Sequence, residues 1–131
     1  MDQCYPVSTP MEISIKLLLL QENEEVIDHA EYRSVVGALN YLTMVTRPDI
    51  TFATGIVVRF VHKPGLVYWQ TVKKILRYLK ETADYGLIFK RNCGADNLTL
   101  DVYCDANWAG DIGDRKSTSG FLVKYKGTAV S

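Results

Sequence analysis

The residues best suited to chemistry lie in the run Tyr-Cys-Asp-Ala-Asn-Trp-Ala-Gly-Asp at positions 103–111, which contains Asp105. A calcium loop of the Asp-x-Asn type is excluded, because its last ligand position falls on Lys116, where a bidentate Glu is required. A Tyr-x-Asp-Asp site is excluded because Ala106 replaces the second carboxylate. Two readings are left: a strand presents Asp105 as one ligand of a two-metal nuclease, or Asp105 simply faces solvent. Two metals need several converging carboxylates, so these residues alone favour the second.

A second candidate is a set of three cations, Lys73, Arg77 and Lys80, at helical spacing. At about 100° per residue, positions i, i+4 and i+7 share one narrow side of a helix, where they could follow a phosphate backbone. An ordinary solvated helix face is the alternative, and for an isolated amphipathic helix it is the commoner case. Three aromatic residues of this segment could stack on bases: Tyr68, Trp69 and Tyr78. Trp69 belongs to the predicted apolar side and is expected to pack.

Composition limits what the whole chain can do. It has 131 residues, of which 47% are apolar, and its fifteen Lys and Arg balance fifteen Asp and Glu. The apolar fraction supports a folded core, whereas zero net charge excludes a generally basic nucleic-acid binder, so any binding must come from a local patch. The three cysteines are odd in number and show no disulfide pattern, which is typical of a reducing compartment. The apolar runs are much shorter than the roughly 20 residues that a membrane span needs. We therefore expect an intracellular protein, cytoplasmic or nuclear and not secreted.

The elements that would position these residues divide the chain into a helical part and a β part. Residues 1–27 are expected to form an extended lead-in, and residues 28–84 a cluster of three helices. Asp28 and Glu31 are spaced like a capping box, and Pro48 and Pro64 end the first and second helices. The third helix is predicted over about 68–82, with this apolar side: Trp69, Val72, Leu76, Leu79 and Ala83.

Residues 85–131 change to a period of two, which predicts strands. A short strand is expected over 87–90, and a longer one over 98–107 with apolar residues on one face and Asp101 and Asp105 on the other. Lys126-Gly127 is expected to form a hairpin turn. The sequence therefore predicts an α+β fold, with a small three-helix cluster followed by an antiparallel β-meander.

Several ordered motifs resemble one known family over nearly the whole chain. They are Pro-Val-Ser-Thr-Pro-Met at 6–11, Tyr-Arg-Ser-Val-Val-Gly-Ala-Leu-Asn-Tyr-Leu at 32–42, Thr-Arg-Pro-Asp-Ile at 46–50, Lys-Ile-Leu-Arg-Tyr-Leu-Lys at 74–80, Asp-Ala-Asn-Trp-Ala-Gly-Asp at 105–111 and Asp-Arg-Lys-Ser-Thr-Ser-Gly at 114–120. Together they resemble the Pol polyprotein of copia-type retrotransposons.

The resemblance implies that residues 28–84 correspond to the thumb and connection region of a reverse transcriptase. It implies that residues 85–131 are the opening part of a ribonuclease H-like domain. Asp105 then matches the first catalytic carboxylate and a metal ligand, in a nuclease that uses two Mg²⁺ ions to hydrolyse the RNA strand of an RNA–DNA hybrid. The later carboxylates and the polymerase aspartates have no counterpart here, so we expect a truncated and catalytically incomplete chain.

Three hypotheses follow from these observations. In the first, the chain is a Pol fragment whose inherited role is handling and cleaving an RNA–DNA hybrid. In the second, it is a non-catalytic module that binds nucleic acid weakly through Lys73, Arg77 and Lys80. In the third, a longer product or a partner chain, such as the remainder of a Pol polyprotein, completes the nuclease. None of the three involves a membrane partner.

Overall fold

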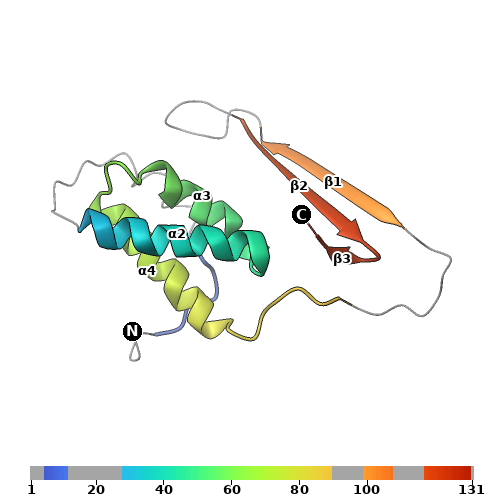
Figure 1. Ribbon diagram of the computed structural model, residues 1–131, viewed down its shortest axis with the longest axis horizontal. Coiled ribbons are helices and arrows are strands. Elements are labelled where there is room, and N and C mark those ends of the chain that lie inside the picture. The colour runs from blue at the N-terminus through green and yellow to red at the C-terminus, as the bar shows by residue number, and fades with distance from the viewer. Residues whose placement is uncertain (1–4, 12–27, 90–98, 108–116, 131) are drawn as a thin grey trace. The chain divides into compact units, whose positions relative to one another are not determined.

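The computed structural model describes residues 5–11, 28–89, 99–107 and 117–130 (Figure 1). The chain divides into two compact units, Met1–Tyr85 and Gly86–Ser131. Within the described residues, the first unit contains three α-helices and the second an antiparallel three-stranded sheet, which confirms the predicted α+β class. No helix of the described residues is long and apolar enough to cross a membrane.

Helix α2 (His29–Val45) begins where the sequence predicts it. Oδ1 of Asp28 accepts hydrogen bonds from the backbone N–H groups of Ala30 at 2.8 Å and Glu31 at 3.3 Å. These two N–H groups would otherwise lack partners in the first turn, so Asp28 is the N-cap. The helix ends before Pro48, which opens the short 3-10 helix η1 (Pro48–Ile50), because proline fits the first turn of a helix.

Helices α3 (Thr51–Arg59) and α4 (Leu66–Glu81) complete the core of the first unit. The buried side of α4 differs from the predicted one. Trp69, Leu76 and Leu79 are only partly buried, and Ala83 is exposed. The side chains that α4 buries are these: Tyr68, Thr71, Val72, Ile75 and Tyr78.

Two tyrosines explain this rotation of α4. The ring of Tyr68 stacks on Phe60 with 3.9 Å between centroids, and the hydroxyl of Tyr78 donates to Asp49 at 2.8 Å. A third tyrosine, Tyr32 of α2, is fully buried and donates its hydroxyl to the carbonyl of Val57 at 2.8 Å. A tyrosine ring can be buried like an aliphatic side chain when its hydroxyl has a hydrogen-bond partner. The spacing of apolar residues does not predict which tyrosines have such a partner.

The second unit is a sheet with strand order β1-β2-β3. Its strands are β1 (Leu100–Asn107), β2 (Thr118–Tyr125) and β3 (Thr128–Ala129). The predicted hairpin turn is confirmed, because Lys126 and Gly127 join β2 to β3 with positive φ angles of 49° and 78°. Positive φ at both central positions matches the right-handed twist of the flanking strands.

The strand predicted over residues 87–90 is wrong for its described part, because residues 86–89 form no strand. Instead, the hydroxyl of Thr128 donates to the carbonyl of Ile88 at 2.9 Å. A single side-chain hydrogen bond takes the place of a backbone ladder. Lys90 lies outside the described residues.

The two units differ sharply in how well they bury their apolar residues. In the helical unit, Tyr32, Ile50 and Ile75 are fully buried, whereas Leu100 and Phe121 of the sheet are 62% and 69% exposed. Little apolar burial and solvent-exposed backbone hydrogen bonds make local opening easier.

We therefore expect backbone amides in the centres of α2 and α4 to exchange with deuterium much more slowly than those of β1 and β2. Hydrogen-exchange mass spectrometry at neutral pH measures this directly. Equally strong protection of the helices and the strands would contradict a difference in stability that follows from this difference in burial.

Candidate nucleic-acid interface

The three predicted cations lie together on the solvent side of α4. At about 100° per residue, Lys73, Arg77 and Lys80 fall within a narrow sector roughly opposite the buried side of the helix. Lys73 and Lys80 are exposed and Arg77 is half-buried. The buried Nε of Arg77 makes no hydrogen bond within the described part of the chain. We call these three residues the basic stripe.

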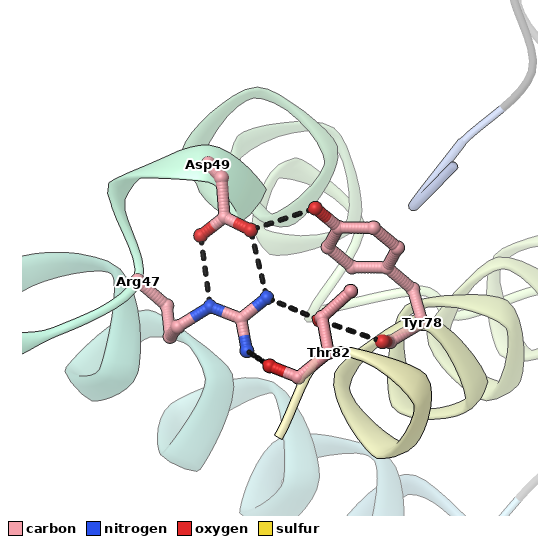
Figure 2. A network of polar contacts seen from close by, with 4 residues as sticks. All are labelled: Arg47, Asp49, Tyr78 and Thr82. Atoms are coloured by element: carbon pink, nitrogen blue, oxygen red, sulfur yellow. Dashed lines mark hydrogen bonds and ion pairs between the residues drawn. The ribbon is translucent and has the colours of Figure 1, made fainter. Parts of the chain in front are cut away.

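The direction of the basic stripe depends on how α4 is held, and Arg47 holds its C-terminal end (Figure 2). Nε and Nη2 of Arg47 donate to the two carboxylate oxygens of Asp49, at 2.9 and 2.7 Å. Its Nη1 donates to the backbone carbonyl of Thr82 at 2.9 Å, and Nη2 also donates to the hydroxyl of Thr82 at 2.6 Å. Since Thr82 is the C-cap of α4, one guanidinium joins η1 to the end of this helix.

Tyr78 closes the network from one turn earlier in α4. Its hydroxyl donates to Oδ2 of Asp49 at 2.8 Å, and its backbone carbonyl accepts from the Thr82 hydroxyl at 2.8 Å. The Arg47 guanidinium lies 5.5 Å from the centre of the Tyr78 ring and 5.9 Å from that of Tyr85. We call the four residues drawn in Figure 2, Arg47, Asp49, Tyr78 and Thr82, the arginine clamp.

The electrostatics of the clamp favour the charged forms of both partners. Hydrogen bonding to Arg47 is the main cause that lowers the pKa of Asp49, and the same bond raises the pKa of Arg47. Burial is the main cause that raises the pKa of Tyr78, and its bond to Asp49 adds to the effect. Both oxygens of Asp49 are engaged, so this carboxylate is a structural counter-ion rather than a metal ligand or a general base.

The sequence indicated no role for the clamp. Arg47 and Asp49 belong to the motif Thr-Arg-Pro-Asp-Ile at 46–50, which contributes to the family resemblance and by itself indicates no contact with α4. The useful signal was an Arg and an Asp two positions apart around a proline, a spacing that can place both side chains on the same side of a turn. Their partners on α4, 29 and 35 positions further along, carry no local signal.

Asp105 occupies a different unit and has different surroundings. It lies exposed on β1, opposite Gly120 of β2, while Asp101 lies opposite Lys124. Within the described residues, no group of three or more His, Cys, Asp or Glu side chains could hold a metal ion. Asp111 and Asp114 lie outside the described residues. The described part of the chain therefore does not assemble the carboxylates that two Mg²⁺ ions need.

Comparison with known proteins places the chain among proteins of mobile genetic elements. It is 42% identical over 118 residues to the retrovirus-related Pol polyprotein from transposon RE2 of Arabidopsis thaliana, covering 90% of this chain and 8% of that protein. It is 40% identical over 136 residues to the corresponding polyprotein from transposon TNT 1-94 of Nicotiana tabacum, covering 100% of this chain and 10% of the relative.

A shorter relative, the secreted RxLR effector protein 161 of Plasmopara viticola, is 48% identical over 100 residues, covering 76% of this chain and 68% of the relative. No protein-family model matches the chain, and no solved structure matches it. The chain belongs to the family of retrovirus-related Pol polyproteins of copia-type retrotransposons, which confirms the resemblance. It spans about a tenth or less of the length of these two polyproteins.

The clamp predicts an asymmetric response to mutation. The Arg47 side chain is 7% exposed and the Asp49 side chain 35% exposed. Asp49→Ala leaves a buried cation without its counter-ion, whereas Arg47→Met leaves a carboxylate that water can still reach. We expect Asp49→Ala to lower the free energy of unfolding by about 3 kcal/mol and Arg47→Met to lower it by less.

Urea denaturation monitored by circular dichroism at pH 7 measures both changes, with the exposed residue Asp84 changed to alanine as the control. Because the folded-state pKa of Asp49 is lowered, the contribution of the clamp is fully present at neutral pH and is lost as the pH falls below about 4. A larger loss for Arg47→Met than for Asp49→Ala would refute this assignment of the charges.

Proposed function

We propose that this segment of a Pol polyprotein handles an RNA–DNA hybrid through the basic stripe of α4, in the position of a reverse-transcriptase thumb and connection region. One observation carries the proposal: Lys73, Arg77 and Lys80 share the solvent side of a helix whose opposite side is fixed in the core. Because the helix is fixed in the core, its three cations already lie on one side before binding, and they can contact successive phosphates without a change of backbone conformation. Membership of the Pol family supplies the class of ligand.

The aromatic residues of α4 favour contact with phosphates over contact with bases. Tyr68 is stacked on Phe60, and Tyr78 is buried beneath Arg47. The ring of Trp69 faces the ammonium of Lys73 at 5.4 Å. Stacking of unpaired bases needs free aromatic faces, and these three rings are already engaged. The proposed contact is therefore independent of base sequence, and it is weak because the chain has no net charge.

For the second unit, we propose that Asp105 has the place of the first ribonuclease H carboxylate. Its exposed position on β1, opposite a glycine, leaves room beside the carboxylate, which supports this proposal. The Mg²⁺ ions of such a nuclease do not fit the described residues, because these residues bring no third carboxylate to the strand. For the described residues, the proposed function is therefore binding of the hybrid rather than its cleavage.

The binding proposal predicts a specific salt dependence. Three cations that neutralise three phosphates of a duplex should give a slope of roughly −3 in a plot of log affinity against log salt concentration. Replacing Lys73, Arg77 and Lys80 together by Gln should flatten this slope almost completely. Fluorescence anisotropy with a short labelled RNA–DNA hybrid of mixed sequence measures the slope.

Lys124 and Lys126 of the second unit are the matched control. Each is a lysine whose ammonium lies over an aromatic ring, at 5.1 Å from Tyr103 and 5.8 Å from Tyr125, and replacing both by Gln should change the slope little. If this pair dominates the slope, or if the triple replacement leaves the slope intact, α4 is not the interface.

The cleavage prediction is separate from the binding one. With Mg²⁺ or Mn²⁺ present, the 131-residue chain should leave the RNA strand of the hybrid intact, because the described carboxylates do not form a two-metal site. Gel analysis of a labelled RNA strand, with a complete ribonuclease H as positive control, tests this. Strong cleavage that disappears in Asp105→Asn would show that the active site is complete.

A further inference from the structure

Trp69 has a fixed position between the core and the basic stripe. Its ring lies 6.1 Å from that of Tyr32, at an interplanar angle of 52°. Tyr32 is fully buried, and its hydroxyl is bonded to the carbonyl of Val57. Trp69 is itself half-buried against this core. Because its neighbours are fixed, the indole presents a face of defined position at the surface of α4.

Lys73 meets this face one helical turn later. Its Nζ lies 5.4 Å from the centre of the Trp69 ring, within the distance at which an ammonium is attracted to an aromatic face. Lys73 is otherwise exposed. A lysine has a flexible four-carbon stem, so ordering it on binding normally costs conformational entropy. A contact that orders the stem beforehand lowers that cost.

We propose that Trp69 is a positioning residue for Lys73, holding its ammonium where it meets a phosphate of the bound nucleic acid. This inference rests on the proposed function of the basic stripe. It gives Trp69 a role beyond packing, since a residue that only packed could be replaced by another apolar residue of suitable shape. Trp69 would then contribute to affinity only while Lys73 is present.

Two substitutions separate positioning from packing. Trp69→Leu removes the aromatic face and keeps an apolar side chain. Trp69→Phe keeps an aromatic ring, but one that attracts cations less strongly than indole. Each is made in the native chain and in the chain with Lys73→Gln. Affinity for the labelled RNA–DNA hybrid is then measured by fluorescence anisotropy, and folding is checked by circular dichroism.

In the native background, we expect Trp69→Leu to weaken binding by about two- to fivefold, the range expected for an exposed cation–aromatic contact, and Trp69→Phe to weaken it less. In the Lys73→Gln background, both substitutions should leave affinity unchanged. The salt slope should be the same for Trp69→Leu as for the native chain, because Lys73 still meets its phosphate. Tyr103→Leu, which removes the ring beneath Lys124, is the matched control and should change nothing.

A second readout needs no nucleic acid. In the free protein, the ring of Trp69 should shift the NMR signals of the Lys73 ε-methylene protons upfield, and Trp69→Leu should abolish this shift. Absence of the shift overturns the proposal, even if a Trp69 variant folds poorly. Equal losses of affinity with and without Lys73 also overturn it, because they indicate packing alone.

The same measurements distinguish a failure of the proposed interface from a failure of the positioning role of Trp69. If replacing Lys73, Arg77 and Lys80 leaves the salt slope intact, or if the native chain does not bind the hybrid, the interface itself is wrong and the role of Trp69 falls with it. If the triple replacement flattens the slope but the Trp69 and Lys73 effects are independent, only the positioning role is refuted.

Discussion

Among the described residues of the helical unit, one buried cation constrains the packing. Arg47 is 5% exposed, and a charge so far removed from water is tolerated only with a counter-ion and several hydrogen bonds. Asp49 supplies the counter-ion, and Thr82 supplies two oxygens from the end of α4. Satisfying Arg47 therefore requires the C-terminal end of α4 to lie against η1. Together with the bond of Tyr78 to Asp49 and the stacking of Tyr68 on Phe60, this contact sets the rotation of α4 and the direction in which the basic stripe faces.

The same constraint separates the structural charges of this protein from those of the proposed interface. Arg47 and Asp49 neutralise each other and are occupied by the fold, so neither is free to contact a ligand. Lys73 lies exposed on the opposite side of α4, where its charge is accessible. In the sheet, Asp101 faces Lys124 across the strands, so the described charges there largely balance. These charges are the reason that the proposed nucleic-acid contact lies on α4 rather than on β1.

Some of this arrangement could be predicted because its causes are local. The cap at Asp28 and the turn at Lys126-Gly127 each depend on neighbouring residues, and both are confirmed. The arrangement of Lys73, Arg77 and Lys80 along one side of α4 was also predictable, because helical spacing fixes which residues share a side. The buried side of α4 was predicted only in part: Val72 is buried as expected, whereas the burial of Tyr78 depends on Asp49, which is distant in sequence. The strand expected over 87–90 failed for a related reason: alternation does not ensure a pairing partner.

In the proposed function, α4 and not the sheet meets nucleic acid. Titration of the ¹⁵N-labelled chain with an unlabelled RNA–DNA hybrid, followed by amide chemical shifts, tests this claim residue by residue. We expect the largest shifts at and beside Lys73, Arg77 and Lys80, with β1 and β2 nearly unchanged. Shifts concentrated around Asp105 and Lys124, with α4 unaffected, would contradict it.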